Sequence, residues 1–152
     1  MDNYQLIGEQ LTALLEGEHK MIANLSNASA LVNQLVSDLN WVGFYLYDPE
    51  LDELYLGPFQ GQVACMHIPL GKGVCGVAAK ERKTLVVKDV TEFPGYIACD
   101  ASAKSELVVP MVKENGELFG VFDLDAPVLD RFTPELVKAL EEVAAIVVKT
   151  ID

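Results

Sequence analysis

The chain has 152 residues, of which 51% are hydrophobic and 22% charged, and this composition predicts one globular domain over residues 1–152. Its net charge of −12 argues against nucleic acid and against anionic membrane surfaces as partners, because both attract clustered Lys and Arg. No apolar run approaches the ~18 residues of a membrane span, and the first ten residues do not resemble a secretory signal, so we expect a cytoplasmic protein.

Two amphipathic helices are expected at the start of the chain. Leucines at near-helical spacing mark the first helix, and Gly17 should end it. The second helix carries an apolar stripe that consists of Leu31, Val32, Leu35, Val36 and Leu39. Ser26 or Asn27 could cap its start.

A hairpin of two strands should follow the helices. Residues 41–47 are rich in aromatic and β-branched side chains, which favour strands, and residues 54–59 are a plausible partner. The period of two in a strand places Trp41 and Tyr45 on one face and Phe44 on the other.

The second half of the chain alternates strand, helix and loop signals. The expected elements are strands at 65–68, 84–87, 106–112 and 118–124, and a helix at 74–81. A long irregular stretch covers 88–104, and Asn115-Gly116 predicts a hairpin turn. Thr133 and Pro134 should cap and begin the last helix. This order predicts an α+β fold with a central antiparallel sheet of about six strands and helices packed on it.

The three cysteines are Cys65, Cys75 and Cys99. An odd number does not fit a secreted disulfide framework, and a disulfide in a reducing cytosol would be transient and catalytic or redox-sensing. The alternative is that the three are small buried hydrophobic residues. His67 lies two residues from Cys65, but no CxxC pair is present, so we expect neither a metal ion nor a bound cofactor.

Three acidic residues are candidates for a shared pocket. Asp123 and Asp125 are two residues apart on one predicted strand and therefore share a face, while Glu106 begins the neighbouring strand. Grouped carboxylates suit a substrate ammonium, and crowding raises the pKa of at least one of them, which could then donate a proton. The alternative is a solvated strand end, where acidic residues are common.

Four segments carry a resemblance to a known family: NWVGFYLYD (40–48), GPFQGQVACMHIPLGKGVCGVAA (57–79), FPGYIACDASAKSELVVP (93–110) and GVFDLDAP (120–127). Together with the flanking helices they resemble the free methionine-(R)-sulfoxide reductase family, an enzymatic branch of the GAF fold. The resemblance covers nearly the whole chain and includes all three cysteines.

The resemblance implies thiol-dependent reduction of free L-methionine-(R)-sulfoxide. Cys99 would attack the sulfoxide and become a sulfenic acid, and Cys65 would then form a disulfide with it. Cys75 corresponds to an auxiliary cysteine, and whether Cys65 or Cys75 is the main resolving thiol stays open. Trp41 and Tyr45 could enclose the thioether methyl group. Thioredoxin as external reductant and a homodimer are further implications.

Two readings without turnover remain as alternatives. The chain could be a GAF-type sensor of a small ligand, or a redox-switch binding module. The sequence lacks the NKFDE-like signature that is associated with nucleotide-binding GAF domains, which disfavours a cyclic-nucleotide sensor.

Overall fold

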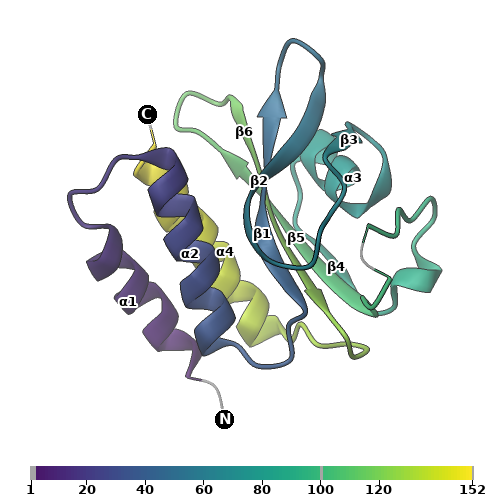
Figure 1. Cartoon of the computed structure of the whole chain (residues 1–152), viewed down its shortest axis with the longest axis horizontal. Helices are drawn as coiled ribbons and strands as arrows, with labels where there is room; N and C mark the ends of the chain where they lie inside the picture. Colours follow the sequence, from purple (N-terminus) through teal and green to yellow (C-terminus); the bar gives the residue numbers. More distant parts are fainter. Residues whose placement is uncertain (1–2, 100, 152) are drawn as a thin grey trace.

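A six-stranded antiparallel sheet forms the middle of the molecule, in the strand order β3-β2-β1-β6-β5-β4 (Figure 1). This computed structural model describes residues 3–99 and 101–151. The strands are β1 (Trp41–Asp48), β2 (Glu53–Gly61), β3 (His67–Pro69), β4 (Leu85–Val87), β5 (Ser105–Val112) and β6 (Leu118–Ala126). The helices are α1 (Tyr4–Leu15), α2 (Met21–Leu35), α3 (Gly73–Glu81) and α4 (Pro134–Lys149), with a 3₁₀ turn, η1, at Val90–Glu92. The predicted α+β fold is confirmed.

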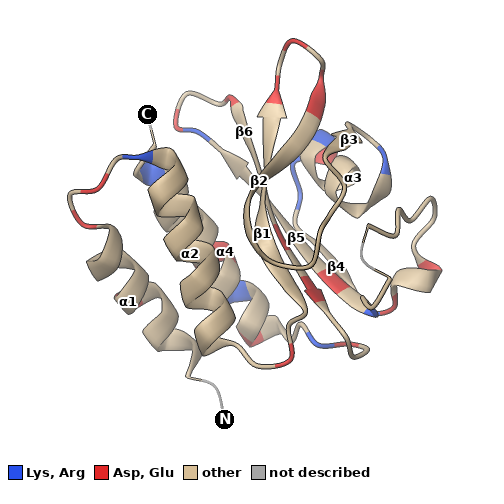
Figure 2. Ribbon diagram, viewed as in Figure 1, with Lys and Arg blue, Asp and Glu red and all other residues tan. Residues whose placement is uncertain are grey.

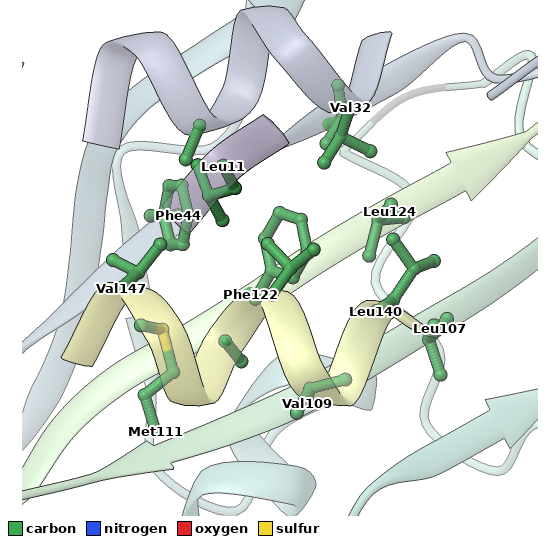
Figure 3. Packing of buried hydrophobic residues seen from close by; sticks show 14 of the residues in the cluster. Leu11, Val32, Phe44, Leu107, Val109, Met111, Phe122, Leu124, Leu140 and Val147 are labelled. Atoms are coloured by element: carbon green, nitrogen blue, oxygen red, sulfur yellow. The ribbon is translucent and has the colours of Figure 1, made fainter. Parts of the chain in front are cut away.

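Helices α2 and α4 cover one face of the sheet, α1 packs against these two helices, and the three together enclose the larger hydrophobic core (Figures 1 and 3). Alternate residues of the strands supply the sheet side of this core. Phe44 of β1 and Phe122 of β6 lie opposite each other in the register, and their rings stack with centroids 4.8 Å apart. Leu140 and Val147 of α4 are fully buried in the same cluster. The predicted face of Phe44 is therefore correct.

The other face of the sheet carries a smaller core under α3 and the loops around it. Trp41 and Tyr45 point to this side, as predicted, and both are almost fully buried. Val74 and Ala78 of α3 pack in the same cluster. Because α3 has only nine residues, the loops that flank it cover much of the sheet on this side (Figure 1).

The start of α2 differs from the prediction. The helix begins at Met21, not at Ser26 or Asn27, and no side chain caps it. Instead, the buried Asn24 side chain donates hydrogen bonds to the Glu18 carbonyl and to Oγ1 of Thr150. Hydrogen bonds to the preceding loop and to the end of α4 therefore hold the first turn of α2. The helix ends at Leu35, so Leu39 of the predicted stripe lies beyond it.

The third strand and the stretch 88–104 also differ from the prediction. The third strand is His67–Pro69, which leaves Cys65 in the loop before it. The stretch 88–104 contains η1, where Asp89 Oδ1 accepts a hydrogen bond from the Thr91 amide at 3.0 Å. The predicted cap at Thr133 is confirmed, since its side chain accepts from the Leu136 amide. Within the described residues, no helix is long and apolar enough to span a membrane.

Candidate active site

A small cavity lies between the second face of the sheet, α3 and the loop that carries Cys99. Its volume is about 30 Å³, which is room for about two water molecules. All predicted site residues except Cys65 line it, namely Trp41, Tyr45, Cys75, Cys99, Glu106, Asp123 and Asp125. The structure therefore brings together residues that lie up to 84 positions apart in the sequence.

Strand register gathers the three carboxylates. Glu106 of β5 pairs with Asp125 of β6, and Asp125 in turn pairs with Trp41 of β1. Asp123 lies two residues from Asp125 and so shares its face. All three acids are less than 9% exposed, and Figure 2 shows acidic residues within central strands whose ribbon is otherwise almost uncharged.

Burial changes the ionisation of these acids. The pKa of Glu106 is raised well above its usual value, first by desolvation and then by the charges of Asp123 and Asp125. Desolvation also raises the pKa of Asp123, although hydrogen bonds from Glu106 and Cys75 act in the opposite direction. Three neighbouring carboxyl groups in so little space cannot all ionise easily, so the cluster holds at least one proton that an exposed acid would have lost.

Cys75 faces the acids from the first turn of α3. Its thiol is buried and donates a long hydrogen bond to Oε2 of Glu106, at 3.9 Å between sulfur and oxygen. Burial, followed by the charges of Asp123 and Glu106, raises the pKa of this thiol well above its usual value. Cys75 is therefore held as a neutral thiol, which is a weak nucleophile.

Glycine allows α3 to approach the sheet. A Cβ atom at Gly76 would lie 2.4 Å from the carbonyl oxygen of Pro69, at the end of β3. Gly73, which begins the helix, has φ +64°, a conformation that side chains disfavour. These two glycines allow α3 to pack closely against the sheet, and this close packing sets the distance of Cys75 from the acids.

Cys65 and Cys99 form a disulfide with Cα atoms 5.3 Å apart, which is the pairing that the family resemblance implies. Both residues are partly buried. The hydroxyl of Tyr45 donates a hydrogen bond to the Cys65 carbonyl at 3.0 Å and so ties the Cys65 loop to the sheet. Cys99 borders the cavity, and Cys65 is bonded to it without lining the cavity.

Three aromatic rings form one wall of the site. The Trp41 ring stacks on Tyr45, with centroids 5.8 Å apart, and on Phe59 of β2, with centroids 5.1 Å apart. Indole Nε1 of Trp41 donates to the carbonyl of Gln62 at 3.1 Å, which orients the ring. Trp41 and Tyr45 therefore supply an apolar surface beside the carboxylates, on the same face of the sheet.

Sulfur and oxygen donors also make the site a possible cation site. Cys75, Glu106 and Asp123 each offer one ligand atom, and these atoms lie within 4.8 Å of one another. His67 does not belong to this group and instead pairs with Glu53 at an exposed position. The cluster retains protons because it is buried, and a protonated thiol and carboxyl are poor metal ligands.

The sequence analysis missed the apolar residues that close the cavity: Ala64, Ile68, Gly73, Val74, Tyr96 and Ile97. Tyr96 and Ile97 lie just before Cys99 in the long stretch that was predicted to be irregular. Loops in compact domains often carry function, and that was the only available signal for these two residues.

Comparisons with known proteins identify the family of the chain. A model of the GAF domain family matches residues 26–152. Free methionine-R-sulfoxide reductase of Escherichia coli (strain K12) is 44% identical over 142 residues, which cover 93% of this chain and 84% of that protein. The protein of the same name from Saccharomyces cerevisiae is 43% identical, with 97% and 87% covered. The structure of fRMsr of Staphylococcus aureus in complex with its substrate is 52% identical and has a TM-score of 0.92, with 99% of this chain and 96% of that chain covered. The chain therefore belongs to the free methionine-R-sulfoxide reductase family of GAF-domain proteins.

Proposed function

We propose that this chain is an L-methionine (R)-S-oxide reductase, which converts free L-methionine-(R)-sulfoxide to L-methionine. The observation that carries this proposal is that Cys99 borders the same cavity as three buried carboxyl groups, in a chain of this family. The relatives from E. coli and S. cerevisiae are named for this reaction.

The carboxylates provide the site for the substrate ammonium. Oδ1 of Asp123 is buried and has no hydrogen-bond partner within the described residues, so it is open to a donor on a ligand. Asp125 lies on the same face and adds negative charge. An amino acid within a peptide lacks the free ammonium, so this arrangement favours the free amino acid. The stacked rings of Trp41 and Tyr45 suit the thioether methyl group, since sulfur–aromatic contacts are worth ~0.3–1.5 kcal/mol.

Glu106 is the proposed proton donor. Its raised pKa keeps the carboxyl protonated where an exposed glutamate has ionised, and a protonated carboxyl can donate to the sulfoxide oxygen. That proton makes the oxygen a better leaving group as the cysteine attacks the sulfur.

The reaction then proceeds in two steps. The Cys99 sulfur attacks the sulfoxide sulfur while its thiol proton passes to the acid cluster, and the sulfoxide oxygen takes a proton from Glu106. The hydroxyl is then transferred to Cys99, and methionine departs with the electron pair of the broken S–O bond, so that the acid cluster ends with the protons it began with. The Cys99 sulfenic acid is attacked by the Cys65 thiol, so that the S–S bond forms and water leaves. Methionine sulfoxide is reduced by two electrons, and the two thiols are oxidised to one disulfide.

Cys65 is the proposed resolving thiol. Support comes from the Cys65–Cys99 disulfide and from the contrast with Cys75, whose thiol lies against Glu106 with its pKa raised by burial. We assign Cys75 an auxiliary role as a neutral donor that helps to keep the acid cluster protonated.

The disulfide form represents the end of the catalytic cycle. In this form the Cys99 sulfur is bonded to Cys65 and cannot attack a sulfoxide, so reduction of the disulfide precedes the next turnover. We assign this reduction to thioredoxin, which reopens disulfides by thiol exchange. The cycle needs no bound cofactor or metal ion, and it needs a reducing compartment, which places it in the cytoplasm.

A homodimer is proposed from the family resemblance. Multi-angle light scattering checks it, with an expected mass twice the 16.6 kDa of one chain. A mass of 16.6 kDa at micromolar concentration would rule the dimer out.

The activity is tested by single turnover of reduced protein, with methionine measured by mass spectrometry. The R epimer should yield about one methionine per chain, and the S epimer and the N-acetylated R epimer should yield none. Cys99→Ser should form no methionine. Stoichiometric binding of the R epimer to wild type without any methionine would make the chain a receptor.

The resolving thiol is tested in the same experiment. Cys65→Ser should release one methionine and leave a sulfenic acid at Cys99 that dimedone traps. Cys75→Ser should still end in a Cys65–Cys99 disulfide. A Cys75–Cys99 disulfide in the Cys65→Ser protein, formed as fast as the wild-type disulfide, would transfer the resolving role to Cys75.

A further inference from the structure

Two exposed apolar side chains lie close to Cys65 in the sequence. Val63 is 89% exposed and Met66 is 71% exposed, and both lie within three residues of Cys65 in the loop between β2 and β3. Ile97, two residues before Cys99, is 38% exposed. Side chains of this kind, placed together around a reactive group, are typical of an interaction surface.

The two chain segments that lead to the cysteines also carry no charged side chain. The segments 54–66 and 93–99 contain no Asp, Glu, Lys or Arg, although 22% of the chain is charged and the net charge is −12. Figure 2 shows the β2–β3 loop as uncharged ribbon, while acidic residues occupy the neighbouring hairpin turns. We call Val63, Met66 and Ile97, together with the two cysteines, the disulfide surface.

We propose that the disulfide surface is the docking site for the protein that reduces this chain, a dithiol reductase of the thioredoxin class, and that the reductase attacks the sulfur of Cys65 and not that of Cys99. The proposal rests on the proposed function in so far as the disulfide is the product of turnover. A reductase must bring its own thiolate to within bonding distance of a sulfur, so its surface around that thiolate must lie against Val63 and Met66.

The two sulfurs differ in their surroundings. Among the described residues that line the acid cavity, Cys99 is present and Cys65 is not. Cys65 is therefore the sulfur that we expect a protein approaching from solvent to reach, on the loop with the exposed apolar side chains. Cys99 faces Glu106 and Asp123, which can supply a proton to a departing thiolate.

The exchange is balanced in two steps. The reductase thiolate bonds to Sγ of Cys65, the Cys65–Cys99 bond breaks, and Cys99 leaves with the electron pair and takes a proton from the acid cluster. The second thiol of the reductase, once deprotonated, then attacks the reductase sulfur of the mixed disulfide, and Cys65 leaves as a thiolate that takes up a proton. The chain gains two electrons and two protons, and the reductase becomes a disulfide.

The test follows reduction of the preformed disulfide by thioredoxin, its reductase and NADPH, without any sulfoxide. Val63→Ser/Met66→Ser should raise the KM for thioredoxin about 10- to 100-fold through lost apolar contact. The matched control is Ile22→Ser/Leu51→Ser, whose wild-type side chains are 70% and 65% exposed on α2 and in the β1–β2 turn, and it should behave as wild type. Since no sulfoxide is present, this result is independent of the proposed activity.

Two further readouts separate docking from other roles. Reduction by dithiothreitol should be equal in all variants, because a small dithiol needs no docking surface, and the oligomeric state should also be unchanged. An unaltered KM for thioredoxin in Val63→Ser/Met66→Ser would overturn the proposal. A change in oligomeric state would assign the surface to a second copy of the chain instead.

The attacked sulfur is identified by trapping. Thioredoxin with the second cysteine of its CxxC replaced by serine should form a mixed disulfide with the tryptic peptide 21–72, which contains Cys65. A mixed disulfide with peptide 89–104, which contains Cys99, would overturn the assignment.

Discussion

The two faces of β6 show opposite uses of neighbouring residues. Phe122 and Leu124 point into the core under α1, α2 and α4 and are fully buried among hydrocarbon. Asp123 and Asp125 alternate with them, are nearly as buried, and point into the cavity. The first pair stabilises the fold by removing apolar surface from water, whereas the second pair places carboxyl groups where ionisation is unfavourable.

The neighbouring strands repeat this contrast. Glu106 of β5 faces the cavity and Leu107 faces the helices, and on β1 Trp41 faces the cavity while Val42 faces the helices. On each of these strands, one residue stabilises the core under the helices and the next residue lines the cavity. Substitutions on the two faces should have opposite profiles, with activity lost from one face and stability lost from the other.

The largest effect is expected on the cavity face at Glu106. Glu106→Gln removes the proposed proton donor and should lower kcat/KM by about 10²–10⁴-fold with dithiothreitol as reductant. The free energy of unfolding should be unchanged or higher, because a buried acid that resists ionisation is replaced by a neutral amide. Steady-state methionine release and urea unfolding measure the two quantities.

The control for Glu106→Gln is Glu114→Gln in the β5–β6 turn, an exposed glutamate that should behave as wild type. If Glu106→Gln retained more than half of the wild-type rate, another carboxyl would have to be the donor, and Asp123→Asn would be the next variant to assay.

The next effect lies on the helix face, one residue from Asp123. Leu124→Ala should lower the free energy of unfolding by about 2–5 kcal/mol, because it removes a fully buried side chain and leaves a cavity. The specific activity of the remaining folded protein should change little. Asp123→Asn is the matched neighbour and should show the reverse pattern, with stability kept and activity lost; if both variants lost stability equally, the separation of the two faces would be wrong.

Local patterns in the sequence predicted much of this arrangement. The two-residue period of β6 is visible in VFDLDA, and it places Asp123 and Asp125 on one face whichever strands pair with β6. The pairing of Glu106 with Asp125 was not predictable, because the register shifts between Met111 and Val112 near the turn. Without that one-residue shift, the register that begins at Val112 and Leu118 would pair Glu106 with Leu124 and turn Glu106 to the helix face.

Other features depended on contacts between distant parts of the chain. The start of α2 is held by Asn24, which reaches Thr150 near the C-terminus, and local cap rules do not include such a partner. The position of Cys75 against Glu106 depends on how closely α3 packs on β3, which follows from Gly76 only once the two elements are placed side by side.

A smaller effect is expected from pH on the stability of the disulfide form. Folding raises the pKa of Glu106 above 4.5 and that of Asp123 above 3.8. Between the unfolded and folded pKa values the folded state binds more protons, so the stability from these groups is fully present below the unfolded pKa and is lost as pH rises through the folded pKa. Urea unfolding from pH 4 upward should show this decrease, and Glu106→Gln should flatten it. An increase in wild-type stability over this range that Glu106→Gln leaves unchanged would contradict the raised pKa.

The smallest expected effect concerns the contact that joins the cavity face to the disulfide loop. The Tyr45 hydroxyl donates to the Cys65 carbonyl, and Tyr45→Phe should lower the free energy of unfolding of the reduced protein by about 0.5–1.5 kcal/mol. Once the disulfide has formed, Cys99 also holds this loop, so the loss in the oxidised protein should be smaller. Tyr47→Phe is the control from the same strand face, because its hydroxyl donates to Asp52 in the exposed turn. An equal loss in the reduced and oxidised forms of Tyr45→Phe would show that the hydrogen bond stabilises the sheet and does not position the Cys65 loop for disulfide formation.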